Sequence, residues 1–306
     1  MGNWTLADMP DLSGKTILVT GANSGLGLES AKAFASKGAE VIMACRNTSK
    51  GEVARESILK ENPSAKLDVV YLDLMDLNSI KETAQKVKSQ YKKLDVLLNN
   101  AGIMTTPFFL TKDGYEAQFA TNHLGHFALT SQLFDLIKSS PNARIVNVSS
   151  IAHKGGIINF GDVNYSNGTK YSPIEAYRRS KIANLYFTFA LDRKIKEKKL
   201  DIKVLAAHPG VSNTNLGRHV ENKWWYKLLF PVFKSMVQEP DMGALPQIRA
   251  SVDESAQSTQ YYGPDGFNKM KGHPVLVQAS KDAYDINIAE RLWNWSEELC
   301  GLEFVV

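Results

Sequence analysis

The sequence predicts an α/β protein with a doubly wound parallel sheet, formed as a single domain over residues 1–306. Two observations support this fold class. Short runs of apolar and β-branched residues alternate with longer amphipathic segments, as expected for strands buried on both faces and the helices that cover them. The first apolar run also leads directly into a glycine-rich turn at the start of a helical segment, as in nucleotide-binding βαβ units.

Each element is expected from its own pattern of residues. The expected strands are Thr16–Thr20, Glu40–Ala44, Val69–Leu72, Val96–Asn99, Ile145–Ser149, Ile202–Ala207 and Gln260–Tyr262. The expected helices are Gly25–Lys37, Lys50–Glu61, Asn78–Tyr91, Phe119–Lys138, Glu175–Lys196, Met242–Val252 and Asp285–Cys300. Neither a repeat nor a low-complexity linker divides the chain. Residues 14–214 are therefore expected to form the core, and residues 215–306 the lid and the C-terminal elements of the same domain.

Composition excludes several classes of protein. Hydrophobic residues make up 43% of the chain and charged residues 22%, which is typical of soluble globular proteins. The net charge of +4 is too small to indicate nucleic-acid binding. The sequence shows no signal-peptide pattern and no apolar stretch long enough to span a membrane. Two distant cysteines, Cys45 and Cys300, favour the reducing cytoplasm over a disulfide framework.

The turn after the first strand has the spacing of a phosphate-binding loop. Gly21, Gly25 and Gly27 lie at offsets 0, 4 and 6 in the sequence GANSGLG. Without Cβ atoms the backbone can approach a pyrophosphate, and the helix that follows offers free N–H groups. A turn without a ligand is the alternative, but its place in the first βαβ unit favours a Rossmann-type cofactor site. Its candidate residues are Gly21, Asn23, Ser24, Gly25, Leu26 and Gly27.

The end of the second strand predicts which nicotinamide nucleotide binds. NAD-binding units usually carry an acidic residue there for the ribose 2′-hydroxyl, whereas this chain has Arg46 and Asn47. A guanidinium suits a 2′-phosphate, and Lys50 adds positive charge nearby. The alternative is that Arg46 is a solvated loop charge. The pattern favours NADP(H), and Cys45 is interpreted as a small buried residue.

Tyr177 and Lys181 form a YxxxK motif within a predicted helix. Residues at positions i and i+4 share one helix face. A tyrosine has a pKa of ~10 and is a poor base at neutral pH, but a nearby lysine cation would stabilise tyrosinate and lower that pKa. The same lysine could hydrogen bond to the nicotinamide ribose. By itself the motif is weak, since a long helix can contain it by chance.

Other motifs accompany it in a particular order. NNAG (Asn99–Gly102) follows the fourth strand, Ser149-Ser150 end the fifth, and HPG (His208–Gly210) follows the sixth. With the glycine turn before them, these motifs resemble the short-chain dehydrogenase/reductase family over about Thr16 to Thr214. Their wording is most similar to the retinol-dehydrogenase and protochlorophyllide-reductase branch.

The resemblance implies roles for residues that spacing alone does not assign. Ser150 corresponds to the catalytic serine, with Ser149 as the competitor. Asn122 corresponds to a residue whose main chain anchors a water leading to the lysine; the alternative is a polar residue that bends a helix. For Asp73 the alternative to adenine binding is a helix N-cap. The implied cofactor-binding residues are Asp73, Leu74, Asn100, Ala101, Gly102, Tyr177, Lys181, Pro209, Gly210, Val211 and Thr214.

Neighbouring segments are expected to shape the substrate site. The gap from Ser150 to Tyr177 would form one wall. Residues 216–238, with aromatic residues at 224–226, would form a lid, a membrane-touching helix or a subunit contact. His123 and His126 are interpreted as packing or interface residues, because a metal needs further ligands. No metal site is expected.

We therefore expect an NADP(H)-dependent oxidoreductase that transfers hydride between nicotinamide and an apolar carbonyl or alcohol, with reduction as the favoured direction. Two alternatives stay open: a reductase of carbon–carbon double bonds, and a non-catalytic NADP(H)-binding sensor. The expected partner is a small molecule, without nucleic acid or a transmembrane segment. Family habit implies a homodimer or homotetramer in which the long helices after strands four and five pair between subunits.

Overall fold

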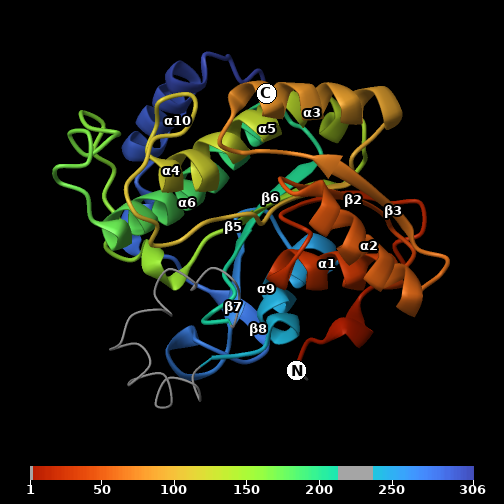
Figure 1. The fold of residues 1–306 in the computed structure, drawn as a ribbon. Coiled ribbons are helices and arrows are strands. Elements are labelled where there is room, and N and C mark those ends of the chain that lie inside the picture. Colours follow the sequence, from red (N-terminus) through yellow and green to blue (C-terminus); the bar gives the residue numbers. More distant parts are fainter. Residues whose placement is uncertain (1–2, 213–236) are drawn as a thin grey trace.

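The computed structural model describes residues 3–212 and 237–306. Within them, eight strands form one sheet in the order β3-β2-β1-β4-β5-β6-β7-β8 (Figure 1). Neighbouring strands from β3 to β7 pair in parallel, and β8 pairs antiparallel with β7. The strands are β1 (Thr16–Thr20), β2 (Glu40–Cys45), β3 (Lys66–Tyr71), β4 (Val96–Asn99), β5 (Ala143–Val148), β6 (Ile202–Ala207), β7 (Tyr261–Pro264) and β8 (Pro274–Val277).

Helices cover both faces of this sheet (Figure 1). One face packs against α1 (Gly25–Ser36), α2 (Thr48–Glu61) and α9 (Pro240–Val252). The other packs against α3 (Leu77–Gln90), α5 (Gly125–Lys138), α6 (Pro173–Glu197) and α10 (Ile286–Cys300). Short helical turns are η1 (Leu6–Asp8), α4 (Ala117–Phe119), η2 (Ala120–Leu124), η3 (Ile151–His153), η6 (Phe267–Lys269) and η7 (Lys281–Tyr284). The predicted doubly wound α/β fold is confirmed.

The sheet departs from the prediction at its C-terminal edge. β7 continues through Gly263 and Pro264, two residues beyond the expected strand Gln260–Tyr262. β8 was not predicted, because it has four residues and only Pro274 is buried. A short, half-exposed edge strand has little apolar signal, and its pairing is decided by the strand beside it. The central strands β1, β4 and β5 are buried along their whole length, which explains their clear pattern.

The long helix predicted after β4 contains a π-helical turn. The chain passes from α4 through η2, which is a π-helix, into α5. π turns inside helices are frequent at functional sites, and this one contains Asn122. The helix also runs very close to the segment after β3, because a Cβ on Gly125 would lie 2.5 Å from the Leu74 carbonyl oxygen. A periodic apolar pattern does not distinguish a π turn from α-helix.

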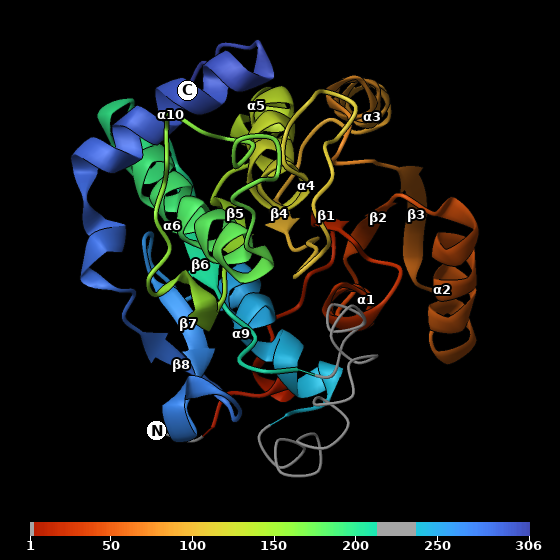
Figure 2. The ribbon, with the colours of Figure 1, turned by 60° about the vertical axis from the view of Figure 1, so that its left-hand side comes forward.

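The C-terminal elements cover α5 and α6. Between residues 176 and 192 of α6, every side chain is buried except that of Arg178. Trp293 of α10 and Phe304 of the tail fill the space beside Phe127, with ring centroids 5.1 and 5.4 Å from it. Figure 2 shows α10 alongside α6. Part of the surface expected to pair between subunits, on α6, is therefore covered by the same chain.

Two observations bear on the surroundings of the protein. In the two described ranges, no helix combines the length and apolar character needed to cross a membrane. Cys45 and Cys300 are both free thiols. Burial raises the pKa of Cys45 to about 11 and that of Cys300 to about 12, so neither thiol is activated.

Candidate active site

Thr20 ends β1 beside β4, where the strand order of the sheet reverses. The Thr20 hydroxyl accepts hydrogen bonds from the backbone N–H groups of Asn100 and Ala101, both at 2.9 Å. The Asn100 side chain donates to the Thr20 carbonyl at 2.7 Å. These contacts join the glycine turn after β1 to the NNAG segment after β4. Ligands of doubly wound sheets bind at such a reversal.

The glycine turn packs so closely on the NNAG segment that side chains at Gly21 and Gly27 would not fit. Gly21 and Gly25 have positive φ values of 70° and 54°, which favour glycine. A Cβ on Gly27 would lie 2.6 Å from Asn100 Nδ2. Ser24 precedes α1 without capping it through its side chain, so the first N–H groups of the helix can bind an anion. This cradle fits a dinucleotide pyrophosphate.

Gln247 supports the turn, and the sequence analysis missed it. Its side chain is buried on α9 and donates to Ser30 Oγ and Asn100 Oδ1, both at 2.9 Å. It therefore connects α9 with α1 and the NNAG segment. The available signal was a lone amide within the apolar run Met242–Ile248, which does not by itself indicate a partner more than 100 residues away.

The residues that follow β2 separate into two roles. Arg46 is exposed, and its Nη1 lies 3.4 Å from the Met75 sulfur. Within the described parts of the chain, no carboxylate forms an ion pair with it. Asn47 caps α2 by accepting a hydrogen bond from Lys50 N at 2.9 Å. The Asn47 side chain is thus committed to the helix, whereas the Arg46 guanidinium faces solvent.

The segment after β3 forms a tight turn. Asp73 Oδ1 accepts a hydrogen bond from Met75 N at 3.0 Å. The helix N-cap is Asp76, which accepts from Asn78 N at 3.0 Å, so the capping alternative for Asp73 is wrong. Leu74 is buried against the close approach of α5.

Tyr177 and Lys181 lie on the face of α6 that meets the end of β5. Their exposed fractions are 6% and 4%. Lys181 Nζ donates to the Val148 carbonyl at 3.1 Å and lies 5.6 Å from the centre of the Tyr177 ring. Gly102 faces the same ammonium group, since a Cβ there would lie 3.5 Å from Nζ. The YxxxK motif and the NNAG segment therefore border one space.

The two serines after β5 point to different partners. Ser149 donates its hydroxyl proton to the Lys181 carbonyl at 2.8 Å and is 1% exposed. Ser150 hydrogen bonds with the Tyr177 hydroxyl, and its Oγ accepts from Ala152 N at 3.2 Å. Strand alternation turns successive side chains to opposite sides, so only one of the pair can reach Tyr177.

Burial controls the acidity of the pair. It raises the pKa of Tyr177 to about 12, although the Ser150 hydroxyl opposes the rise. It lowers the pKa of Lys181 to about 8. The pKa of Tyr177 is therefore raised, where the YxxxK spacing predicted a lowering, because burial is the larger effect. The Tyr177 hydroxyl is therefore a protonated acid at neutral pH.

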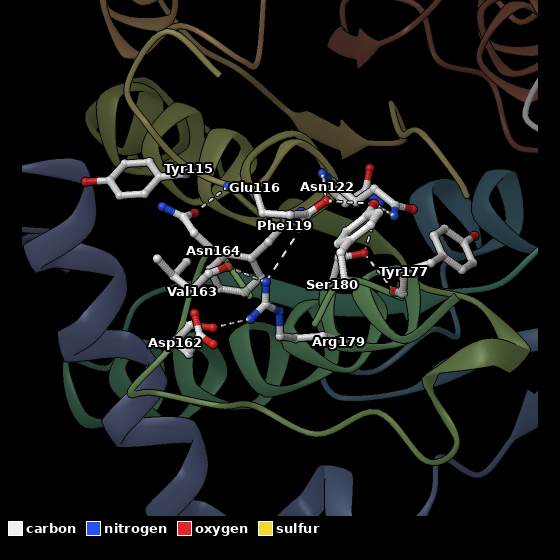
Figure 3. Close-up of polar contacts among 12 residues, drawn as sticks. Tyr115, Glu116, Phe119, Asn122, Asp162, Val163, Asn164, Tyr177, Arg179 and Ser180 are labelled. Carbon is white, nitrogen blue, oxygen red and sulfur yellow. Dashed lines mark hydrogen bonds and ion pairs between the residues drawn. The ribbon is translucent and has the colours of Figure 1, made fainter. Parts of the chain in front are cut away.

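Asn122 holds the segment after NNAG through its side chain. Its Oδ1 accepts from Ile103 N at 2.8 Å, and its Nδ2 donates to the Ile103 carbonyl at 2.9 Å. The same Nδ2 lies 2.9 Å from Ser180 Oγ on α6 (Figure 3). The Asn122 amide thus joins the π turn to the segment after β4 and to α6, the helix that carries Tyr177.

His126 connects Asn122 to Thr20, a role that the packing interpretation missed. His126 Nδ1 lies 3.1 Å from the Asn122 carbonyl oxygen, and Nε2 lies 2.9 Å from Thr20 Oγ1. Since a carbonyl only accepts, Nδ1 carries the proton and Nε2 accepts from the Thr20 hydroxyl. Burial lowers the pKa of His126 to about 4, which keeps the ring neutral. His123 instead packs among aromatic rings and contacts Ser296.

The predicted PG segment lies at the end of β6. Gly210 has a positive φ of 67°. Val211 N donates to the Met270 carbonyl at 2.7 Å, and the Gln238 side chain donates to the Pro209 carbonyl at 2.7 Å. Thr214 and residues 216–236 of the predicted lid lie outside the described residues.

The segment between Ser150 and Tyr177 uses its aromatic residues for its own support. The Phe160 ring packs against Trp295 at 5.3 Å, and Tyr165 packs against Tyr171 at 5.5 Å. Tyr171 donates to the Thr106 carbonyl at 3.0 Å.

Over residues 3–212 and 237–306, no group of three or more His, Cys, Asp or Glu side chains could hold a metal ion.

Comparison with known proteins gives three kinds of match. A profile of the short chain dehydrogenase family matches residues 15–224. Human retinol dehydrogenase 13 is 38% identical over 295 residues, which cover 95% of this chain and 86% of that protein. Human retinol dehydrogenase 14 is 38% identical over 307 residues, with 95% and 88% covered. A solved structure from Mycobacterium paratuberculosis is 39% identical with a TM-score of 0.83, covering 100% of both chains. The matches include both the glycine turn and the YxxxK motif.

A Thr20→Val substitution tests the junction between β1 and β4. It keeps the side-chain shape but removes the acceptor of the Ala101 N–H group, while the Asn100 N–H group keeps its contact with the Leu98 carbonyl at 3.0 Å. An unsatisfied buried group costs about 1–3 kcal/mol, so we expect urea denaturation to show a loss of about that size in the free energy of unfolding. Thr16→Val, on the same strand, is the control and should change it by less than about 0.5 kcal/mol. Equal losses in the two variants would contradict this role of Thr20.

Proposed function

Since the chain belongs to the short-chain dehydrogenase family, we propose that it is an NADP(H)-dependent oxidoreductase that uses Tyr177 as its general acid or base. The family catalyses hydride transfer between CH–OH and C=O groups. The observation that carries the proposal is the meeting of the Tyr177 and Ser150 hydroxyls beside Lys181. This is the set needed to hold a carbonyl oxygen and give it a proton.

Carbonyl reduction is the direction that the site favours. Tyr177, with its pKa raised to about 12, holds a proton at neutral pH and can donate it to the oxygen as that oxygen gains negative charge. Ser150 orients the same oxygen by a hydrogen bond. The nicotinamide, when bound, supplies the hydride. Lys181 would bind its ribose, and Asn122 keeps the Ile103 segment and α6 in register.

The cofactor would lie along the carboxyl ends of the strands. Gly21, Gly25 and Gly27, with the N-terminus of α1, would bind the pyrophosphate. Arg46 supports the choice of NADP(H), because it is exposed at the end of β2 with its guanidinium available for a 2′-phosphate. Asp73 and Leu74 would border the adenine, and residues 100–102 and 209–211 would line the nicotinamide half.

An apolar alcohol or carbonyl is the proposed substrate class. Its support is the likeness over nearly the whole chain to proteins named retinol dehydrogenases, since retinol is an apolar alcohol.

The free thiols Cys45 and Cys300 suit a cytoplasmic location. A homodimer or homotetramer is also part of the proposal, but its contact would need a surface other than the outer face of α6, which α10 covers.

Substitutions at three hydroxyls test the chemistry. We expect Tyr177→Phe and Ser150→Ala each to lower kcat by about 10²-fold or more, the range of positioned acid–base groups. Ser149→Ala is the matched control and should retain most turnover, because its hydroxyl binds the Lys181 carbonyl. NADPH oxidation with aldehydes, ketones and quinones is the measurement. Full turnover by Tyr177→Phe would overturn the proposed mechanism.

Arg46→Ser tests the cofactor. Loss of a charge-assisted contact to the 2′-phosphate should raise the KM for NADPH by about 10- to 100-fold, in line with about 1.5–3 kcal/mol for such contacts. The KM for NADH should change little, because NADH lacks that phosphate. Lys50→Ser is the control and should have a smaller effect. An equal rise for both nucleotides would show that Arg46 does not read the phosphate.

The lowered pKa of Lys181 predicts how activity depends on pH. The ammonium group is charged below about pH 8 and neutral above it. We therefore expect kcat/KM for NADPH, which reports groups of the free enzyme, to fall as the pH rises through about 8. Lys181→Arg keeps its charge throughout this range and should lose the alkaline fall, even if its rate is lower. A flat profile for the unsubstituted enzyme would contradict this role.

A further inference from the structure

Arg179, in the middle of the YxxxK motif, is buried but does not face the catalytic pair. Its exposed fraction is 1%, whereas the neighbouring Arg178 is partly exposed and pairs with Glu175 on the same helix, at 2.7 Å. Figure 3 shows that the Arg179 side chain points toward the segment at Asp162 and away from Tyr177. Nothing in the hydride-transfer chemistry requires this buried cation.

The guanidinium holds the backbone between Ser150 and Tyr177. Its Nη1 donates to the Asp162 carbonyl at 3.1 Å, and its Nη2 donates to the Val163 carbonyl at 2.6 Å. Its Cζ lies 4.2 Å from the centre of the Tyr165 ring and 5.0 Å from that of Phe119. A planar group with several donors is suited to bind two carbonyls while it stacks on rings.

A buried carboxylate balances this cation. Glu116 is 0% exposed, and its Oε2 lies 3.7 Å from Arg179 Nη2. Glu116 also caps α4 by accepting from Gln118 N at 2.8 Å and Phe119 N at 2.9 Å. Burial raises the pKa of Glu116 and lowers that of Arg179, so each charge depends on the other. A buried ion pair adds little net stability compared with apolar packing, which points to a positional role.

The segment that Arg179 holds has an unfavourable backbone. Tyr165, Ser166 and Asn167 are consecutive residues with φ values of 51°, 50° and 54°. Side chains disfavour this left-handed region, and a run of three such residues needs support from its surroundings. Asp162 gives local support by accepting from Ser166 N at 2.6 Å. The Arg179 contacts on Asp162, Val163 and Tyr165 tie this segment to α6.

The same support reaches the segment that follows NNAG. Gln118 Oε1 accepts from Thr105 N at 2.8 Å, and Gln118 Nε2 donates to Tyr171 Oη at 2.7 Å. Asn164 Oδ1 accepts from Glu116 N at 2.9 Å. Residues 103–106, α4 and residues 162–171 are therefore joined, and the first of them, Ile103, is held by Asn122 against the helix that carries Tyr177.

We propose that Arg179 is a positioning residue that fixes residues 162–171 as a rigid wall of the substrate site and thereby determines the KM for the carbonyl substrate. The kinetic part rests on the proposed function, whereas the structural part does not. Because the contacts described for this wall reach residues 105–118 and not the glycine turn, Arg179 acts on substrate binding and leaves NADPH affinity unchanged.

The proposal is tested with a double variant, a conservative variant and a matched control. Arg179→Met alone would leave Glu116 as an unpaired buried charge, which can prevent folding. The double variant R179M/E116Q removes both charges and is the main test. Arg179→Lys keeps a cation but cannot bind both carbonyls and stack on the rings. Arg178→Met is the matched control, because it removes an arginine one position away that holds no part of the wall.

The first measurement is trypsin cleavage, followed by mass spectrometry, after the exposed residues Lys170 and Lys154. We expect R179M/E116Q to speed cleavage after Lys170 by about tenfold or more, which is about 1.4 kcal/mol in the opening equilibrium. Arg179→Lys should give an intermediate rate. Cleavage after Lys154, which lies before the wall, should change little in every variant. Unchanged cleavage after Lys170 in the double variant would overturn the proposal.

The second measurement separates binding from chemistry. In R179M/E116Q we expect the KM for the carbonyl substrate to rise about tenfold while kcat and the Kd for NADPH stay within about twofold, as for loss of uniform binding. Arg178→Met should match the unsubstituted enzyme. A loss confined to kcat, or an equal loss of NADPH affinity, would overturn the positioning role. If the unsubstituted protein reduces no carbonyl compound, the proposed function fails, and the cleavage experiment still decides whether Arg179 fixes the wall.

Discussion

The hydroxyl of Thr20 is the contact on which the rest of the site depends. It accepts two backbone N–H groups from the NNAG segment and donates to His126, so all of its hydrogen-bonding capacity is used. Since His126 in turn donates to the Asn122 carbonyl, one side chain ties together the glycine turn, the exit of β4 and the π turn. The strand order reverses at this point, and the helices that follow β1 and β4 lie on opposite faces of the sheet, which leaves room for a ligand between the two connections.

Burial gives this site its chemical character. The same low-polarity surroundings raise the pKa of Tyr177 and lower that of Lys181, because both charged forms lose solvation. The result is a tyrosine that holds its proton and a lysine whose charge is easily changed. A hydrogen bond from Lys181 to the Val148 carbonyl directs the ammonium group. The electrostatics of the pair therefore depend on where the end of β5 lies.

The C-terminal elements complete the molecule by covering α6. Apolar residues surround α6 on nearly all sides, and such a helix must be covered either by its own chain or by another. Here Trp293 and Phe304 provide the cover. On the same helix, the Arg179 side chain reaches the wall segment and Glu116, so α6 connects the sheet, the catalytic pair and the wall.

The sequence alone determined the alternation of strands and helices, the glycine turn and the YxxxK spacing, because these follow from local periodicity and from residues close together in the chain. It predicted neither β8 nor the π turn at Asn122, since edge pairing and an inserted helical residue leave no periodic signal. It favoured Ser150 over Ser149 only through the family resemblance, and it did not predict the roles of His126, Gln247 or Arg179. Only the tertiary structure decided these, because the partners of each lie on other elements, and a buried polar group is defined by what it meets there.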